Sequence, residues 1–238
     1  ASPIPATMAS SITGVEHVDP GMSDNTGSYM IMFGFRKGPT DDLNFRKAVT
    51  LSLDYELLAA TIGGEDAQVP GVGVIAPPNL GYDETLPKLE QNLEAAKAAL
   101  DEGGYLDVDG DGYREMPDGS PMDILVSPQN SSTRREIYLR IAEVMVQNLD
   151  AIGVKAHVDE QSITNEEYET RRQASDEKAY IEGTKLLQQI NAEQYIGEAL
   201  CWDKAYFPYR TDRYEGWTNY PGWGVINCET WYSLRPVR

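Results

Sequence analysis

Apolar residues recur every three or four positions in several stretches of the chain, which is the spacing of a helix that buries one side. The clearest stretch covers residues 132–153 and closes at Gly153. Its apolar stripe consists of Ile137, Ile141, Val144, Met145 and Leu149, and the residues that can cap its start are Ser131, Ser132 and Thr133. Shorter stretches predict helices from about Asp42, after Asp54, over 89–100 and over 176–194.

Other segments alternate between apolar and polar residues, or stay apolar for several residues, which indicates strands. The predicted strands lie within residues 14–20, 27–35, 121–128, 154–163 and 195–202. In the second of these both alternating sets are apolar, so we expect it to be buried on both faces. The order strand, long helix, strand between residues 121 and 163 predicts a βαβ crossover. The pattern therefore predicts an α/β fold with a parallel or mixed sheet flanked by helices.

The negative charge of the chain argues against partners that are themselves negatively charged. It has 38 acidic and 20 basic residues, a formal net charge of −18. Such a surface repels phosphate backbones and anionic lipids, so we expect neither nucleic-acid nor membrane-surface binding. No apolar run approaches the roughly 20 residues of a membrane helix. Residues 1–10 lack the basic start and apolar stretch of a secretory signal, so we expect a mature form or a segment that begins inside a longer protein.

The sharpest local motif is DVDGDGYREMPD, residues 107–118. Three aspartates at alternate positions precede a glycine, as in the calcium loop of an EF-hand, and an aspartate replaces the usual final glutamate. The expected ligands are Asp107, Asp109, Asp111, the backbone carbonyl of Tyr113, and Asp118. The alternative is an acidic turn held by Asx-type hydrogen bonds without a metal. No cofactor is required, and Ca²⁺ is the one ion that the sequence suggests.

Residues 195–238 form a tail rich in Trp, Tyr, Pro and Gly. Its aromatic side chains can line a groove for a small solute, or they can pack the base of the fold. The candidates for ligand contact are Trp202, Tyr206, Trp217 and Trp223. The two cysteines, Cys201 and Cys228, fit either one disulfide in an oxidising compartment or two unrelated buried thiols. No nucleophile motif is present, so we assign no catalytic residue.

Several segments, taken in order, resemble the peptide/nickel-type solute-binding proteins of bacterial ABC importers, called family 5. DDLNFRKAVTLSLDYELL is similar to that family's signature, and the matching positions are Asp42, Arg46, Ala48 and Asp54. Residues 87–126 resemble the Leu-Ala helix, Gly-Tyr turn, acidic loop and strand that follow in the family. YRTDRYEGW, residues 209–217, resembles its closing segment.

The resemblance implies one lobe of a type II periplasmic-binding-protein fold, formed by residues 1–238 as a single α/β unit. Residues 195–238 then correspond to the closing segment next to the hinge. Family members are much longer and have two lobes, so the chain is similar to a trimmed C-terminal lobe. No position matches the aspartate with which the family contacts its ligand.

The resemblance also implies a function, that of a monomeric, non-catalytic binding component of an ABC importer. Such a protein captures a peptide or similar small solute outside the cytoplasm and delivers it to the permease in the membrane. We expect a lipid anchor in the full-length parent. Peptides, nickel complexes, sugars and opine-like compounds share this scaffold, so the ligand stays open. Two alternatives are a calcium-stiffened interaction domain without a small ligand, and a hydrolase that uses two carboxylates of different pKa.

Overall fold

The structure, a computed structural model, describes residues 4, 6–24, 28–34, 38–129, 134–158, 185, 188, 195, 197–221 and 224–237. Its helices are α1 (Ala6–Ile12), α2 (Leu43–Ser52), α3 (Tyr55–Gly63), α4 (Leu93–Glu102), α5 (Arg135–Asp150) and α7 (Cys228–Ser233), with a short 3-10 turn η1 (Gly64–Asp66). Its strands are β1 (Val18–Asp19), β2 (Met22–Asp24), β3 (Tyr29–Met32), β4 (Ile124–Val126), β5 (Ala156–Val158), β6 (Gly197–Cys201), β7 (Lys204–Tyr206), β8 (Tyr209–Arg210), β9 (Tyr214–Glu215) and β10 (Arg235–Pro236). Most of the helix expected over 176–194 lies outside the described residues.

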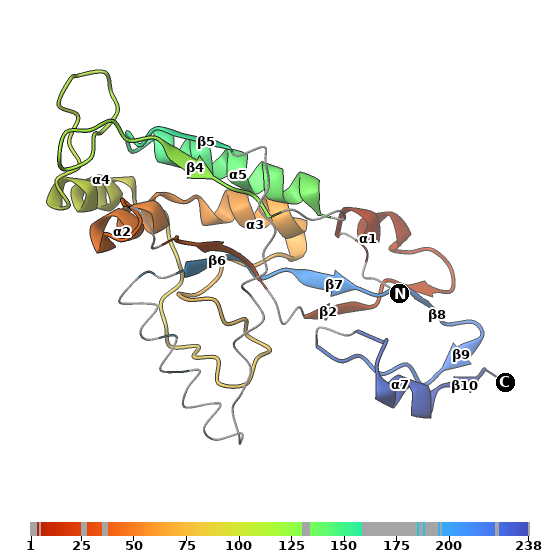
Figure 1. Cartoon of the computed structure of the whole chain (residues 1–238). Helices are drawn as coiled ribbons and strands as arrows, with labels where there is room; N and C mark the ends of the chain where they lie inside the picture. Colours follow the sequence, from red (N-terminus) through yellow and green to blue (C-terminus); the bar gives the residue numbers. More distant parts are fainter. Residues whose placement is uncertain are drawn as a thin grey trace.

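Helices α2, α3, α4 and α5 form a layer on one side of strands β3 and β6 (Figure 1). α2 packs against α4, and α3 packs against both α5 and β6. The side chains between them form one core, in which Leu58, Leu100, Leu149 and Leu200 are almost completely buried. Each fully buried leucine contributes about 1.5–3 kcal/mol of transfer free energy, so this layer stabilises the fold.

The starts of α2 and α3 confirm the two predicted aspartate caps. Asp42 accepts a hydrogen bond of 2.7 Å and Asp54 one of 2.9 Å, each from a backbone N–H in the first turn of its helix. Arg46 is buried, and its guanidinium donates to the carbonyl oxygen of Thr40 at 3.1 Å. Burial lowers the pKa of Arg46, and the neighbouring Asp42 carboxylate opposes this shift. Arg46 therefore anchors the turn that leads into α2.

Helix α5 begins after Arg134, its N-cap residue, which makes no side-chain capping bond. The predicted capping residues, Ser131, Ser132 and Thr133, lie outside the described residues. The Arg134 guanidinium instead donates to the Tyr29 hydroxyl at 3.2 Å and lies 5.6 Å from the centre of that ring. The predicted stripe is confirmed, since Ile141 and Leu149 are buried and Ile137, Val144 and Met145 pack against the same core.

The βαβ crossover is confirmed. β4 and β5 pair in parallel, with Ile124 opposite Ala156, and α5 connects them. The other four strand pairs that the structure describes are antiparallel, so both pairing senses of a mixed sheet are present. Among the described residues these strands form separate two-stranded ladders rather than one continuous sheet.

Strand β3 is buried on one face only. Tyr29 and Ile31 face the core, whereas Met32 keeps 53% of its surface exposed, so the expectation of burial on both faces is wrong. Its partner β6 is the strand that is buried throughout, from Gly197 to Cys201. The strongly apolar character of the β3 sequence alone did not distinguish a central strand from an edge strand.

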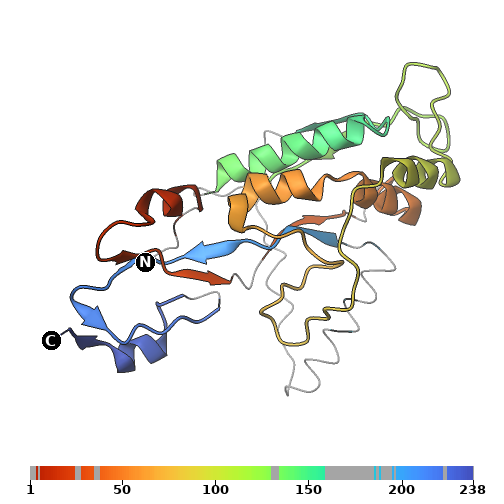
Figure 2. The same ribbon diagram turned by 180° about the vertical axis from the view of Figure 1, so that it is seen from behind.

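The two ends of the chain are joined by strand pairs. β1 pairs with β8 and β2 with β7, both antiparallel, so residues 18–24 lie beside residues 204–210. The tail forms its own small cluster around Phe207 and Val225. Figures 1 and 2 show that this tail, with β9, β10 and α7, lies at the end of the molecule opposite α4.

Within the described parts of the chain, every helix is too short or too polar to cross a membrane.

Candidate functional site

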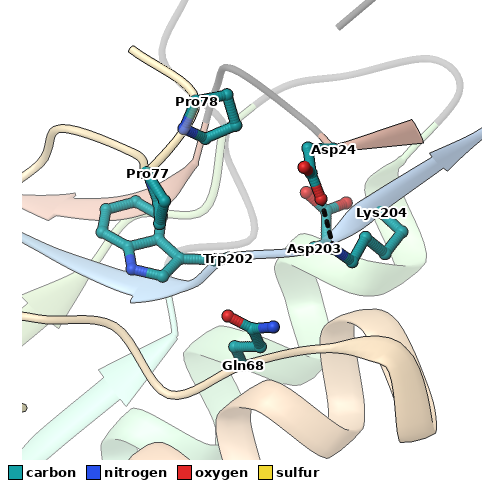
Figure 3. A pocket seen from close by; sticks show the side chains of 7 residues that line it. All are labelled: Asp24, Gln68, Pro77, Pro78, Trp202, Asp203 and Lys204. Carbon is teal, nitrogen blue, oxygen red and sulfur yellow. Dashed lines mark hydrogen bonds and ion pairs between the residues drawn. The ribbon is translucent and has the colours of Figure 1, made fainter. Parts of the chain in front are cut away.

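A small pocket lies where three distant parts of the chain meet (Figure 3). Its volume is about 180 Å³, and the residues that line it are Asp24, Gln68, Pro77, Pro78, Trp202, Asp203 and Lys204. They come from β2, from the irregular segment that follows η1, and from the stretch between β6 and β7. The pocket therefore depends on the long-range pairing of β2 with β7.

The pocket combines an apolar wall with charged groups. Pro77, Pro78 and the Trp202 indole provide the apolar side, and Figure 3 shows Pro77 next to the indole. Opposite them, the Lys204 ammonium forms an ion pair with the Asp24 carboxylate. Asp203 adds a second carboxylate. Such a mixture suits a ligand with both apolar and hydrogen-bonding groups.

Trp202 is held firmly by the backbone. It exchanges two hydrogen bonds with Gln68, of 2.9 and 3.0 Å between backbone N and O. Its side chain is 6% exposed and packs against Ala76 and Ala199. The indole Nε1 is buried and has no acceptor in the part of the chain that the structure describes. Of the three predicted ligand contacts that the structure describes, Trp202 is the one that lines the pocket.

The other aromatic candidates have structural surroundings. Tyr206 is buried, and its hydroxyl donates to a carboxylate oxygen of Asp66; burial, then this bond, raises its pKa well above the usual value. Trp217 donates through Nε1 to the carbonyl oxygen of Tyr214 at 3.1 Å and packs on the ring of Tyr209, 4.8 Å away. Trp223 lies outside the described residues. The packing alternative therefore fits Tyr206 and Trp217 better than ligand contact.

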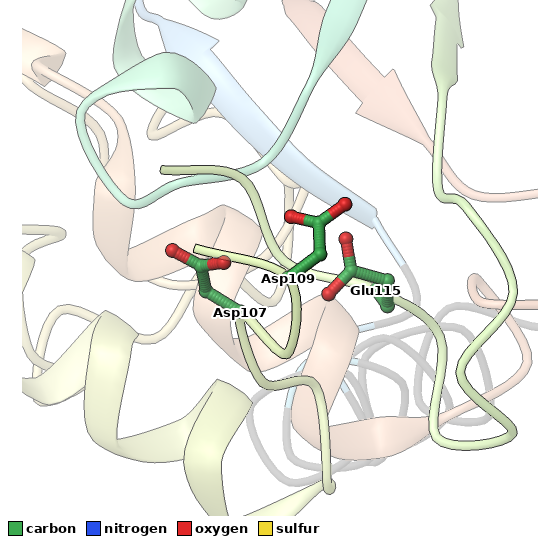
Figure 4. Close-up of side chains that lie close together, drawn as sticks. All are labelled: Asp107, Asp109 and Glu115. Carbon is green, nitrogen blue, oxygen red and sulfur yellow. The ribbon is translucent and has the colours of Figure 1, made fainter. Parts of the chain in front are cut away.

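The acidic loop brings together a different set of carboxylates from the predicted one (Figure 4). Oxygens of Asp107, Asp109 and Glu115 lie within 4.8 Å of one another. Glu115 occupies the ninth position of the loop and was not among the expected ligands. Asp111 and Asp118 do not join this group, and Asp118 instead accepts bonds from the N–H and hydroxyl of Ser120.

The same loop carries the Asx-type hydrogen bonds of the metal-free alternative. Asp107 accepts from the N–H groups of Gly110 and Gly112, at 2.7 and 3.1 Å. Glu115 accepts from the N–H of Val108 at 2.8 Å. The Tyr113 hydroxyl donates to Asp150 at 2.9 Å, which ties the loop to the end of α5. The loop is therefore fixed by its own hydrogen bonds, and the calcium prediction stays a prediction.

Both cysteines are free thiols in the structure. Cys201 is buried in β6 and Cys228 is exposed at the start of α7. The predicted disulfide is therefore not formed. The alternative, two buried thiols, holds for Cys201 and not for Cys228. Burial raises the pKa of the Cys201 thiol to about 12, so this thiol stays protonated at neutral pH.

Sequence reasoning missed the buried carboxyl of Glu198. This residue is the second of β6, is 0% exposed, and accepts a bond of 2.7 Å from the N–H of Gly73. Burial raises its pKa to about 7, and the Gly73 bond opposes this shift. A glutamate inside the apolar strand pattern of residues 195–202 was the signal that could have found it.

A hydrolase of the predicted kind needs two carboxylates in one cleft. The pocket contains two, those of Asp24 and Asp203. Asp24, however, is paired with the Lys204 ammonium. The hydrolase alternative also needs a nucleophile or two acids in different environments, and the sequence contains no nucleophile motif.

Comparison with known proteins shows the family of the chain. The family model of the bacterial extracellular solute-binding proteins, family 5 (middle part), matches residues 1–185. The oligopeptide-binding protein AppA of Bacillus subtilis is 27% identical over 178 residues, which are 72% of this chain and 28% of AppA. The chain therefore spans less than a third of that relative's length.

Solved structures show the same fold. AppA in complex with a nonapeptide superposes with a TM-score of 0.72 at 19% identity, covering 99% of this chain and 56% of AppA. NikA from Brucella suis in complex with Fe(III)-EDTA gives a TM-score of 0.74 at 15% identity, covering 98% of this chain and 56% of NikA. These likenesses confirm the α/β, type II periplasmic-binding-protein fold. Since the family model covers most of the sequence, the chain belongs to the bacterial extracellular solute-binding proteins of family 5.

Proposed function

We propose that this chain is the solute-binding component of an ABC importer, or a lobe of one. It captures a peptide or a similar small solute outside the cytoplasm and delivers it to a permease in the membrane. Support comes from the family and from AppA, an oligopeptide-binding protein. We further propose that it acts as a monomer, without catalysis, and that its full-length parent carries a lipid anchor.

The observation that carries the proposal is the pocket beside Trp202. A peptide has a repeating amide backbone, charged ends and variable side chains. The Trp202 and Pro77 surfaces suit an apolar side chain, and the Asp24–Lys204 pair offers a carboxylate and an ammonium to the polar groups of the backbone or its ends. A pocket with both apolar and charged walls tolerates many peptide sequences, because water can fill the space that a small side chain leaves.

The chain covers only part of the family fold, and this limits its affinity for a solute. The chain spans 56% of the AppA structure. Family members close two lobes around a ligand, and one lobe supplies part of the contacts while the cost of immobilising the ligand stays the same. We therefore expect the chain alone to bind peptides weakly.

Isothermal titration with di- to pentapeptides tests the proposal. Saturable binding of at least one peptide class is expected, and it should weaken at least about tenfold in Lys204→Met, since that change leaves Asp24 without its cation. Arg235→Met is the matched control. It also removes the cation of an ion pair, with Glu215, but on an exposed strand pair in the tail away from the pocket. Absence of binding to every peptide, or equal loss in both variants, contradicts the proposal.

A further inference from the structure

The carboxyl of Glu198 is a buried ionisable group that the proposed solute pocket does not use. It is the second residue of β6 and is fully covered by neighbouring atoms. One oxygen, Oε2, accepts the bond from the N–H of Gly73, and the other, Oε1, is buried without a partner among the described residues. An ionised carboxylate here loses its hydration and regains a single hydrogen bond, which is unfavourable.

The groups that surround this carboxyl offer it no charge of opposite sign. From α3, Tyr55 faces it, and Tyr195 faces it from the residues before β6. Burial first, and then the negative charge of Glu198, raises the pKa of both tyrosines, so both are neutral at neutral pH. On β3, the residue opposite is Ile31. Across the described part of the chain, no lysine, arginine or histidine side chain contacts the Glu198 carboxyl.

The partner of Glu198 belongs to residues 69–79, VPGVGVIAPPN, which we call the Pro-Gly loop. This loop contains no charged residue. Gly73 fixes it to β6 twice: its carbonyl oxygen accepts from the N–H of Ala199 at 3.0 Å, and its N–H donates to Glu198. Gly73 has a φ of 98°, which glycine adopts freely and other residues rarely do. The attachment is therefore local and depends on one glycine.

The far end of the Pro-Gly loop forms the apolar wall of the pocket. Pro77 and Pro78 line it, four and five residues after Gly73. The seam between the loop and β6 also holds the buried Trp202 Nε1 that has no acceptor. Among the described residues, Glu198 Oε1 and Trp202 Nε1 are both buried without hydrogen-bond partners, which disfavours the closed seam.

We propose that Glu198 is a proton-controlled latch, which holds the Pro-Gly loop against β6 while its carboxyl is protonated and releases the loop when it ionises. On ionisation the carboxyl gives its proton to water, and the resulting carboxylate draws water into the seam. The wall formed by Pro77 and Pro78 then moves away from Trp202, and the pocket opens. The latch links the shape of the pocket to external pH.

The pH window follows from the two states of the latch. While the loop covers it, Glu198 has a pKa of about 7; once the loop is open and the carboxyl is hydrated, its pKa is the ordinary 4.5. Between pH 4.5 and pH 7, Glu198 therefore carries a proton when the loop is closed and has lost it when the loop is open. Opening therefore becomes more favourable as the pH rises from about 4.5 to about 7, and it does not change further above that range.

Amide hydrogen exchange followed by mass spectrometry tests the latch without any ligand. The whole chain is measured from pH 5 to pH 8, with rates corrected for the intrinsic effect of pH. Peptides that cover residues 69–79 should lose protection by at least about tenfold between pH 5 and pH 7 and then level off. Peptides from α2 and α4 in the same samples should stay better protected than the loop at every pH, which separates loop opening from global unfolding.

Glu198→Gln is the decisive variant, because it keeps the shape and the acceptor oxygen but cannot ionise. Its loop protection should be high and independent of pH. Gly73→Ala should leave the loop poorly protected at every pH, because alanine disfavours the φ of 98° that presents the N–H. If Gly73→Ala does not fold, Glu198→Gln alone decides.

The proposal is overturned if the wild-type loop shows no pH dependence, or if Glu198→Gln keeps the same slope. Infrared spectroscopy gives an independent measure: the band of a protonated buried carboxyl should be present at pH 6, disappear above about pH 8, and be absent from Glu198→Gln. The pocket's role in solute capture rests on the proposed function, but these measurements use no solute. A chain that binds no peptide can still show the latch, and a chain without the latch can still bind peptide.

Discussion

The backbone N–H of Asp54 donates a hydrogen bond of 2.9 Å to the side-chain amide oxygen of Asn148. Asp54 is the N-cap of α3, so this bond joins the start of α3 to the last turns of α5. The two helices that flank the core are thereby fixed by a polar contact as well as by their apolar faces.

Asn148→Ala should lower the free energy of unfolding by about 1–2 kcal/mol, because it leaves the partly buried Asp54 N–H without an acceptor. Urea denaturation followed by circular dichroism measures this change. Gln147→Ala, at an exposed position one residue earlier in α5, is the control and should change stability by less than about 0.5 kcal/mol. Equal effects of the two substitutions would argue against the contact.

A glycine comparison tests the junction between the two ends of the chain. Gly21 and Gly14 both have positive φ, 62° and 82°. A Cβ on Gly21 would lie 2.1 Å from the carbonyl oxygen of Phe207, whereas nothing lies within 4 Å of a Cβ on Gly14. Gly21→Ala should therefore destabilise the protein far more than Gly14→Ala, which carries only the cost of about 1 kcal/mol for the backbone conformation.

Thermal melting of the Gly21→Ala and Gly14→Ala variants gives the readout. The Gly21 variant should melt at least about 5 °C lower than the Gly14 variant, because the clash with Phe207 breaks the contact beside β2 and β7. Similar melting midpoints would show that the junction adapts to the added methyl group.

Much of the local structure was predictable from the sequence. The caps at Asp42 and Asp54, the stripe of α5 and the βαβ crossover all depend on residues close together in the chain, where spacing alone decides the outcome. The pairing of residues 18–24 with 204–210 was not predicted, because a short strand is compatible with many partners and nothing local selects one.

The candidate site shows the same contrast between local features, which the sequence predicts, and long-range contacts, which it does not. The acidic loop was found from its motif, but the motif placed Asp118 in the cluster, where the structure places Glu115. Asp118 forms its own turn with Ser120, which is a competing local hydrogen bond. The pocket around Trp202 and the attachment of Gly73 to Glu198 arise from contacts across more than 100 residues, which no local pattern encodes.

The calcium prediction for the acidic loop is testable by melting. If Ca²⁺ binds the group of Asp107, Asp109 and Glu115, a tenfold excess over its Kd should stabilise the fold by about 1.4 kcal/mol and raise the midpoint by about 3 °C. The comparison is made between added calcium and added chelator.

Two variants distinguish the predicted loop from the observed cluster. Glu115→Gln should abolish the calcium effect if the cluster holds the ion, and Asp118→Asn should then preserve it. The reverse result would favour the EF-hand spacing read from the sequence. No shift of the midpoint with calcium in the wild type would support the metal-free turn.

The Glu198 carboxyl also makes global stability depend on pH. Its pKa is about 7 in the folded protein and has the ordinary value of 4.5 after unfolding. Unfolding therefore releases a proton between these values, and the stabilising contribution of the protonated group, complete below about pH 4.5, is lost as the pH rises to about 7. Each pH unit in this window costs up to about 1.4 kcal/mol.

Urea denaturation at pH 5, 6, 7 and 8 measures this dependence. Glu198→Gln should remove the fall between pH 5 and pH 7, and the difference between variant and wild type should be largest above pH 7. The exposed carboxylates with lowered pKa, Asp83, Asp118 and Asp212, act in the opposite direction and below about pH 4, outside this window. An equal fall in both proteins would assign it to other groups.

The ladder between β2 and β7 has a consequence for how the chain is made. Lys204 and its partner Asp24 are 180 residues apart, so β2 cannot form its ladder until the 180 residues that follow it have been made. Contacts at such separation form slowly. The segment that carries β7 therefore completes both the ladder and the cavity beside it at one late step of folding.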